Sequence, residues 1–267
     1  MYSYCGGRQA NGIHTRMLTL VVVAKNEADR IARCLRSVPF ASRRLVLDSG
    51  STDDTVSVAQ ACGAEVVETD WPGFVAQKNR ALSLVDTPYA LSLDADEWLT
   101  ERAASEAEAV VQSGAEGAGR PVGWSFPRVS LWQGREVRHG AWYPDRKLRL
   151  VRMEARPQWG GDDPHDRLVV HGPVQRLHGD IGHDPYRRFA DHLRTIDRYT
   201  ALNAAALADR GVTARRRDPW VHGVGHFAKS FVVQRGYRDG PMGLVLAGLG
   251  AVHAGLKWHR LRGLSEG

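Results

Sequence analysis

Asp94 and Asp96 are the residues of this sequence best suited to chemistry. The two carboxylates stand two residues apart at the end of a strand predicted over Tyr89–Asp94, so both can reach one divalent cation. Oxygen ligands of this kind suit Mg²⁺ or Mn²⁺ better than Zn²⁺, and such a cation neutralises a diphosphate and stabilises it as a leaving group. The alternative is that the acids only cap the next helix, but their place after an apolar strand favours a metal site.

Two further segments offer contacts to a nucleotide. Asp48 follows the apolar residues 45–47, and a carboxylate there can accept hydrogen bonds from a base or ribose. A simple Asx-turn is the alternative. Residues 77–80, Gln-Lys-Asn-Arg, combine two cations and two amides near a predicted helix start, which suits phosphate or nucleotide contacts. A solvated helix face has the same composition.

Alternating strands and helices must position these residues. Apolar runs predict strands at Leu18–Ala24, Leu45–Asp48, Ala64–Glu68 and Tyr89–Asp94. Helices are predicted from an Asn26 N-cap to Pro39, from a Ser51–Asp54 capping box to Gly63, over Ala76–Leu84 and over Thr100–Gln112. This alternation predicts an α/β fold with a parallel, doubly wound sheet. Ligands of such sheets bind beyond the carboxyl ends of the strands, where Asp48 and Asp94 lie.

The rest of the chain has fewer strands and becomes helical. Strands are predicted at Trp124–Val129 and Lys147–Val151, and helices over Phe189–Ala208, Trp220–Arg235 and Gly243–Leu256. The last helix is only weakly apolar and is interrupted by glycine, whereas a helix that spans a bilayer needs roughly 20 apolar residues. We therefore expect it to lie on a membrane interface or in a protein core.

The basic charge of the 267-residue chain lies in its last third. From Arg187 onward there are 14 Lys and Arg against 6 Asp and Glu, whereas the preceding part holds 22 against 24. Such a region could meet nucleic acid, an anionic membrane surface or a phosphorylated acceptor. A solvated basic face is the alternative.

The first residues and the cysteines indicate a cytoplasmic protein. Residues 1–16 lack the apolar segment of a signal peptide, so we expect a disordered leader, with Met17 as a possible true start. Three cysteines, at positions 5, 34 and 62, fit neither a disulfide framework nor a zinc site and point to a reducing compartment.

Five motifs occur in an order and spacing that resemble the family 2 glycosyltransferases, in particular the branch of lipopolysaccharide inner-core β-1,4-glucosyltransferases. They are Val22–Glu27, Val46–Asp53, Asp70–Gly73, Gln77–Leu82 and Leu93–Glu97. The resemblance is dense over 18–99 and continues more thinly to about residue 243. It implies a GT-A-type fold, with a mostly parallel sheet flanked by helices, and an inverting single displacement. We expect a GT-A domain over 17–186, with a nucleotide-binding half (17–99) and an acceptor half (120–186), followed by a basic helical region (187–267).

The resemblance also implies roles for particular residues. Asp48 matches the contact to the nucleobase or ribose, with Lys25 and Glu27 in the same pocket, and Lys78 and Asn79 match donor-side contacts. Asp94 and Asp96 match the metal and diphosphate motif, with Asp96 the more direct ligand. His183 aligns with a histidine that completes metal or diphosphate binding, although a loop histidine is more often structural.

An inverting transfer also needs a carboxylate that takes the proton of the acceptor hydroxyl. In the branch that this chain resembles, a His-Glu pair before a Val-rich strand supplies it, and here His165 and Asp166 occupy that place. Asp166 is the predicted base, one methylene shorter than the family's Glu, with Asp163 as its rival and a plain turn as the structural alternative. Trp142, Tyr143 and Arg149, with His165, are predicted to shape the acceptor site, since aromatic faces are good sugar platforms.

The resemblance implies transfer of a hexose, glucose from UDP-glucose, to a lipid-linked saccharide such as the lipopolysaccharide inner core. The expected partners are a UDP-sugar, this acceptor and the inner leaflet of the cytoplasmic membrane, to which the chain binds peripherally. Nucleic acid is not expected as a partner. A polyprenyl-phosphate glycosyltransferase is the nearest alternative. A nicotinamide-dependent oxidoreductase is disfavoured because Lys-Asn-Glu-Ala-Asp-Arg stands where Gly-x-Gly-x-x-Gly is required. A nucleic-acid-binding module leaves the ordered motifs unexplained.

Overall fold

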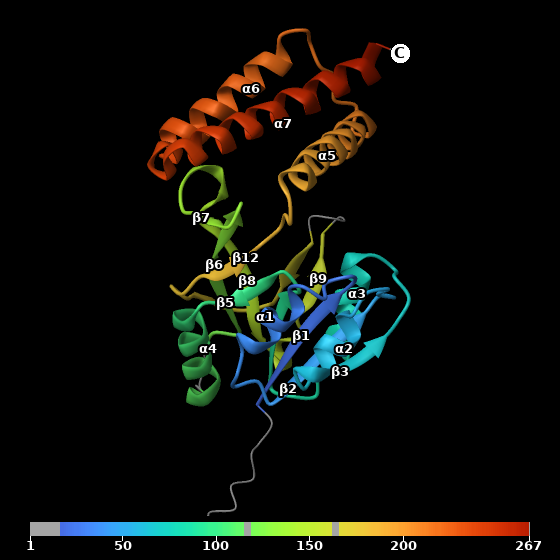
Figure 1. Cartoon of the computed structure of the whole chain (residues 1–267), viewed down its shortest axis with the longest axis vertical. Coiled ribbons are helices and arrows are strands. Elements are labelled where there is room, and N and C mark those ends of the chain that lie inside the picture. Colours follow the sequence, from blue (N-terminus) through green and yellow to red (C-terminus); the bar gives the residue numbers. More distant parts are fainter. Residues whose placement is uncertain (1–16, 115–118, 162–165, 267) are drawn as a thin grey trace, which may run out of the picture.

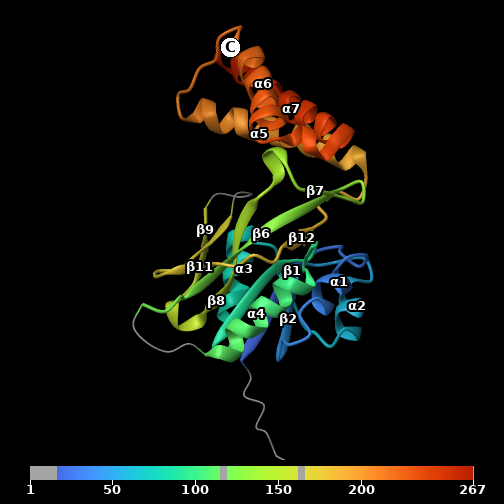
Figure 2. The same cartoon turned by 90° about the vertical axis from the view of Figure 1, so that its left-hand side faces the viewer.

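The computed structural model describes residues 17–114, 119–161 and 166–266. A curved sheet with helices on its faces forms the lower part of the molecule, and three long helices form a separate layer at one end (Figures 1 and 2). The predicted leader (1–16), His165 and Asp163 lie outside the described residues.

The first half of the sheet is parallel, as the alternation predicts. Its strands lie in the order β3-β2-β1-β4 and are β1 Leu18–Ala24, β2 Arg43–Asp48, β3 Glu65–Glu68 and β4 Tyr89–Asp94. Strand β1 is buried on both faces: Leu20 and Val22 pack into the main core, while Val21 packs with residues of β2 and α3 on the other side. The helices between the strands are α1 Ile31–Arg36, α2 Thr55–Ala61 and α3 Phe74–Ser83.

Two predicted helix starts are wrong. Asn26 does not cap α1: its φ is +57°, its side chain accepts a hydrogen bond from the amide of Thr52, and the helix begins five residues later. The expected capping box at Ser51 and Asp54 is absent, because the Ser51 hydroxyl donates to Asp48 and Asp54 makes no side-chain cap. In both cases the polar side chain joins two loops at the carboxyl ends of β1 and β2.

The second half of the sheet is mixed. Strand β8 Asp145–Arg152 lies antiparallel beside β4, and β6 Gly123–Trp132 lies antiparallel to β8. Strand β12 Ile181–His183 then joins β6 to β5 Glu97–Leu99. This part of the molecule also contains α4 Glu101–Ser113, β7 Arg135–Val137 and β11 Val174–Arg176, with β9 Gln158–Gly160 and β10 Arg167–Val169 as a separate pair. This is a GT-A-type fold, and β5 and β12 bring Glu97 and His183 to the edge where β4 ends.

The helical layer consists of α5 Phe189–Asp209, α6 Asp218–Ala228 and α7 Gly240–Glu266. The expected helix over Trp220–Arg235 ends earlier and continues as a π-helical turn, Lys229–Val233, while the last helix is longer than expected. The layer is joined to the sheet through Asp239, which accepts hydrogen bonds from the amides of Arg138 and His139. No helix in the described ranges is long and apolar enough to cross a membrane.

Candidate active site

A cavity of about 780 Å³ opens at the carboxyl ends of β1 and β4. Its wall is formed by the end of β1 and the loop after it, helix α3 and the loop before it, and the end of β4. Single residues of β6, β12 and α5, and Asp166 just before β10, complete it. Seven of the site residues predicted from the sequence line it: Lys25, Glu27, Lys78, Asp94, Asp96, Asp166 and His183. The cavity therefore brings together the predicted metal and base residues and part of the predicted donor residues, from segments up to 158 residues apart.

Asp94 is held between two cations. Its Oδ1 lies 2.6 Å from Lys78 Nζ, and its Oδ2 lies 2.9 Å from Arg149 Nη2. Burial alone would raise the pKa of this carboxyl, but the charges of Lys78 and then Arg149 hold its pKa well below the usual range. Asp94 is therefore ionised, and both of its oxygens already have charged donors.

Lys78 links Asp94 to the predicted base. Its ammonium lies 2.7 Å from Asp166 Oδ2 as well as 2.6 Å from Asp94, and it sits 4.3 Å from the centre of the Trp159 ring. Burial lowers the pKa of the amine, but the nearby carboxylates outweigh it, so the pKa of Lys78 is raised. A buried, charged lysine thus fixes Asp166 on the wall of the cavity.

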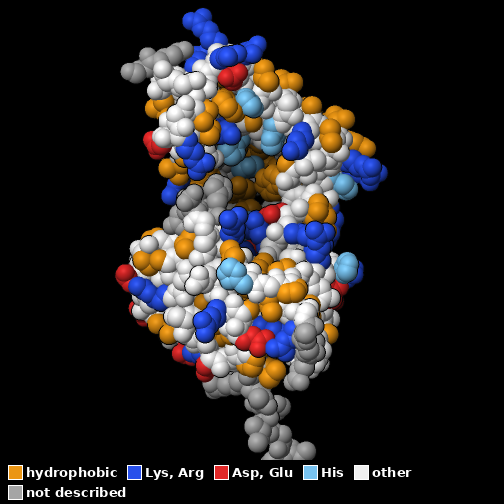
Figure 3. Space-filling view, turned by 180° about the vertical axis from the view of Figure 1, so that it is seen from behind, with side chains coloured by type: hydrophobic (Ala, Val, Ile, Leu, Met, Phe, Trp, Pro, Cys, Tyr) orange, Lys and Arg blue, Asp and Glu red, His pale blue; other side chains and the backbone are white. Residues whose placement is uncertain are grey.

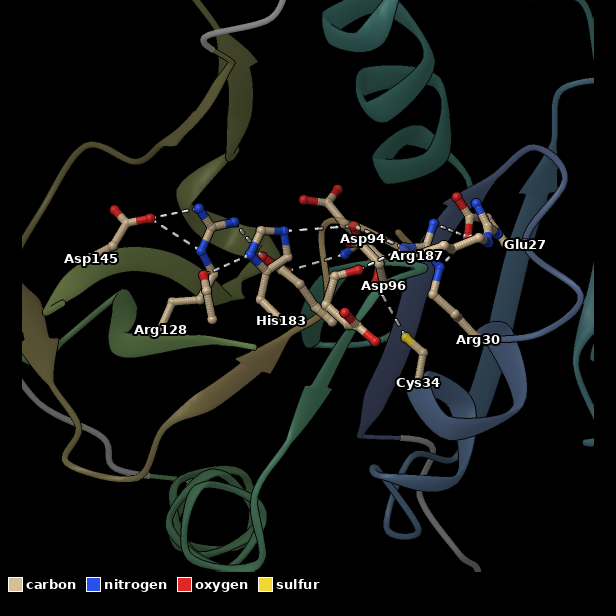
Figure 4. A network of polar contacts seen from close by, with 12 residues as sticks. Glu27, Arg30, Cys34, Asp94, Asp96, Arg128, Asp145, His183 and Arg187 are labelled. Atoms are coloured by element: carbon tan, nitrogen blue, oxygen red, sulfur yellow. Dashed lines mark hydrogen bonds and ion pairs between the residues drawn. The ribbon is translucent and has the colours of Figure 1, made fainter. Parts of the chain in front are cut away.

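Asp96 lacks such close compensation. Its Oδ2 is 3.6 Å from His183 Nε2 and 3.9 Å from Arg30 Nη1 (Figure 4). Burial, followed by the charges of Asp94 and Glu97, raises the pKa of Asp96 to about 7. Excess negative charge at a carboxylate next to an imidazole is an environment that a bound cation would stabilise.

His183 is arranged as a neutral ligand. Its Nδ1 lies 3.0 Å from the Ser130 hydroxyl, which orients the ring with Nε2 toward Asp96 (Figure 4). Burial and then the charge of Arg128 lower the pKa of His183 to about 4, and a metal binds the neutral form of imidazole. Asp96 and His183 therefore fit a hard divalent cation, although no group of three or more His, Cys, Asp or Glu among the described residues is arranged as a metal site.

Glu97 and Arg149 form the buried charge network beneath these residues. The fully buried Glu97 accepts hydrogen bonds from Arg149 and Arg128 at 2.9 Å, and Arg128 in turn pairs with Asp145. Although burial opposes it, the charge of Arg149 lowers the pKa of Glu97 to about 2. Arg149, predicted to shape the acceptor site, is instead a buried partner of Glu97 and Asp94.

Residues 19–147 match the family model of glycosyl transferase family 2. An uncharacterized glycosyltransferase of Mycobacterium bovis is 32% identical over 149 residues, which cover 52% of this chain and 68% of the relative. The chain belongs to glycosyl transferase family 2. An uncharacterized glycosyltransferase of Rickettsia conorii is 40% identical over 100 residues, 37% of this chain. The match spans only 36% of that relative.

Solved structures similar to this family 2 chain include two complexes. One is glucosyl-3-phosphoglycerate synthase from Mycobacterium tuberculosis with Mn²⁺, UDP and glucosyl-3-phosphoglycerate, which is 19% identical and matches 74% of this chain and 81% of that chain with a TM-score of 0.45. The other is S. aureus TarS 1–349 with UDP-GlcNAc, which is 12% identical and matches 94% and 90% of the two chains with a TM-score of 0.48.

Glu27 connects the family 2 domain to the helical layer. Its carboxylate accepts a hydrogen bond from Arg30 Nε at 2.7 Å and pairs with Arg187 Nη2 at 3.0 Å. Arg187 also pairs with Asp29 and lies just before α5. The motif residue Glu27 therefore does more than line the pocket, because it anchors the segment that leads into α5.

Asp48 and Asn79, two predicted donor contacts, do not line the cavity. Asp48 is buried, and its carboxylate accepts hydrogen bonds from the amides of Gly50 and Ser51, which is the Asx-turn that the sequence left as an alternative. The Asn79 amide exchanges two hydrogen bonds of 2.9 Å with the backbone of Trp159. Both residues thus brace the walls of the site in this conformation.

Trp142 and Tyr143 also lie outside this cavity. Trp142 packs against Tyr186 and His192 beneath the helical layer, and the Tyr143 hydroxyl donates to Asp180 at 3.0 Å. Their backbone leads from β7 to β8, on the side of the sheet that faces α5 to α7. The predicted acceptor residues Trp142 and Tyr143 therefore lie next to the helical layer and not in the cavity that contains Asp94 and Asp96.

Sequence reasoning missed several residues of the wall. Trp71 and Phe74 line the cavity and form an edge-to-face pair with ring centres 4.7 Å apart. Tyr199 of α5 lines it as well. The motif Asp70–Gly73 could have identified Trp71. No local pattern marks Tyr199 or Arg128, because these residues reach the cavity only through the tertiary placement of α5 and β6.

Proposed function

We propose that this family 2 chain is an inverting, metal-dependent glycosyltransferase that moves a hexose, glucose from UDP-glucose, to a lipid-linked saccharide such as the lipopolysaccharide inner core. The observation that supports it best is the position of Lys78, whose ammonium lies 2.6 Å from Asp94 and 2.7 Å from Asp166. The Asp-x-Asp motif for the donor and a carboxylate for the acceptor thus share one cavity, as a single displacement requires.

The metal would be held by Asp96 and His183, with donor oxygens completing its shell. Mg²⁺ or Mn²⁺ bound there supplies positive charge to the departing diphosphate. Arg30 lies within 3.9 Å of Asp96 and adds a fixed positive charge on the same side. Asp94 acts through Lys78 and Arg149, which its carboxylate orients.

Asp166 would take the proton of the attacking hydroxyl. In the described conformation its carboxylate is paired with the ammonium of Lys78. A diphosphate bound beside Lys78 would compete for the same ammonium and so free Asp166 for the acceptor. Donor binding would in this way precede activation of the base.

Placement at the inner face of the cytoplasmic membrane, as a peripheral protein, is part of the proposal. Trp220 of α6 is 77% exposed and Val224 is 66% exposed, and three arginines, 215–217, immediately precede this helix. Hydrophobic and basic side chains lie side by side on the helical layer (Figure 3). An anionic leaflet complements both features.

Calorimetric titration of a nucleotide-sugar panel, with Mn²⁺ and then with EDTA, tests the donor half of the proposal. We expect wild-type protein to bind UDP-glucose in a metal-dependent manner and Asp96→Ala to bind it at least about tenfold more weakly, since a metal ligand is lost. The control is Asp209→Ala, which removes an exposed carboxylate at the end of α5. If folded wild-type protein binds no member of the panel, the proposed function is wrong.

A further inference from the structure

A second cavity of about 450 Å³ lies between the three helices of the layer and the turn that contains Trp142. Its wall includes Trp142, Tyr186, His192, His226, His253 and Lys257. The proposed transfer reaction, as described above, uses none of these residues.

Lys257 gives this second cavity a positive charge. Three histidines and one lysine line it, and no Asp or Glu is among its lining residues in the described part of the chain. Burial and then the charge of Lys257 lower the pKa of His253, while burial, Lys229 and Lys257 lower the pKa of His226. The cationic groups therefore oppose one another's protonation, and an anion between them would relieve this repulsion.

The imidazole of His192 is preorganised as a donor. The Trp132 indole, which can only donate, gives a hydrogen bond of 3.2 Å to His192 Nδ1. The neutral ring must then have its proton on Nε2. Tyr186 stacks on this ring with centres 4.4 Å apart and an angle of 14° between the ring planes. This stacking fixes the orientation of the imidazole and of its Nε2–H donor.

Gly250 makes room for His226. A Cβ at this position of α7 would lie 2.4 Å from His226 Nε2, so only glycine lets the imidazole approach the helix so closely. A larger side chain at position 250 would therefore displace His226 and fill part of the cavity.

The second cavity is next to the active site. Tyr199 lines the first cavity, whereas Ile196 and Asn203 line the second, and residues spaced by three and four lie on one face of a helix. The chain from His183 to Tyr186 likewise passes from one wall to the other. Figure 3 shows a hollow between the helical layer and the sheet domain, with histidine side chains above it.

We propose that the second cavity binds a phosphate group, held by Lys257 and the three histidines. Assigning this phosphate to the acceptor rests on the proposed function; the binding itself does not. A phosphate placed here would orient an acceptor whose reacting hydroxyl reaches the neighbouring cavity. The phosphate could belong to a soluble sugar or to a lipid headgroup.

Histidine resonances of the full-length protein test this directly. Histidine-labelled protein is titrated with inorganic phosphate, and the signals of His226 and His253 are assigned with the variants His226→Gln and His253→Gln. We expect saturable shifts of both signals. Lys257→Gln should weaken phosphate binding about tenfold, as expected for loss of a charged hydrogen-bond donor. Arg238→Gln, which removes an exposed charge from the same layer, should leave binding unchanged.

A second variant and two other ligands complete the design. Gly250→Leu should abolish the shifts by filling the space beside His226, with UDP-sugar binding retained as a check of folding. Shifts with glucose 6-phosphate but not with glucose support a phosphorylated sugar, and shifts with vesicles of phosphatidic acid but not phosphatidylcholine support a headgroup. Unshifted histidines with all three phosphates, or wild-type affinity in Lys257→Gln, overturn the proposal. A failure of UDP-sugar binding in wild-type protein contradicts the proposed function instead.

Discussion

At the residue level, the side chains of the candidate active site form a linear network of alternating positive and negative charges rather than a set of independent ligands. Asp166, Lys78, Asp94, Arg149 and Glu97 follow one another through contacts of 2.6–2.9 Å. Each buried charge in the network has an opposite charge beside it, which is the condition for keeping ions out of water. Asp96 lies at the edge of this network without so close a partner, and this difference is why we propose Asp96, and not Asp94, as the carboxylate that binds the metal.

Replacing Asp166 by Asn removes the proposed base while keeping its shape. We expect turnover to fall by roughly 10²- to 10⁴-fold. Donor affinity should be no weaker than that of wild type, because Lys78 retains Asp94 at 2.6 Å and loses a competitor for its ammonium. Single-turnover transfer and calorimetric donor binding measure the two effects. Asp86→Asn, on the exposed loop before β4, is the matched control. Wild-type turnover in Asp166→Asn would contradict the assignment of the base.

The sequence could identify residues with a local signature but not their partners. Asp94 and Asp96 follow a strand whose bounds were predicted correctly, so their common cavity could be expected. The surroundings of Arg149 in the sequence, close to Trp142 and Tyr143, predict an acceptor contact. Its pairing with Glu97, 52 residues away, depends on the pairing of β8 with β4, which nothing in the sequence reveals. His183 has no local signal of its own and was found only through resemblance.

At the scale of elements, the site depends on strands that were not predicted. Strands β5 and β12 pair antiparallel with Glu97 opposite His183, and this short ladder brings the acidic motif and the histidine together. Three-residue strands have too little periodicity to be recognised, whereas the long runs of β1 and β4 were predicted residue for residue. Helix starts failed where polar side chains joined loops instead of capping helices, as at Asn26.

Gly182 permits the pairing of β12 with β5. A Cβ at this residue would lie 2.1 Å from Cε2 of the Trp98 ring, so Gly182→Ala must displace a strand or the indole. We expect it to lower the free energy of unfolding by about 1–3 kcal/mol, measured by urea denaturation. Gly160→Ala is the control, since that strand glycine has nothing within 4 Å of a built Cβ. If Gly182→Ala and Gly160→Ala have the same free energy of unfolding, the contact between residue 182 and Trp98 is relieved without loss of stability, and the prediction is wrong.

At the scale of the whole molecule, the chain divides by charge as well as by architecture. The nearly neutral sheet domain holds the first cavity, and the helical layer holds the basic excess of 14 cationic against 6 anionic residues counted from Arg187. Arg187 pairs with Glu27 and thereby joins the layer to the active site. An acceptor presented from a membrane would meet the basic layer first and the cavity second.

Vesicle binding distinguishes this arrangement from a merely solvated basic face. Burying an exposed aromatic or aliphatic side chain in a bilayer interface contributes about 1.5–3 kcal/mol at most, so the double variant Trp220→Ser, Val224→Ser should bind anionic vesicles at least about tenfold more weakly in a sedimentation assay. Binding of wild-type protein should also weaken as salt is raised, because the arginines before α6 are exposed to screening. The control removes exposed apolar side chains from the sheet domain, Leu84→Ser with Val174→Ser, and should bind like wild type. If both double variants bind equally well, the α6 surface does not contact the membrane, and the apolar residues on it have another role.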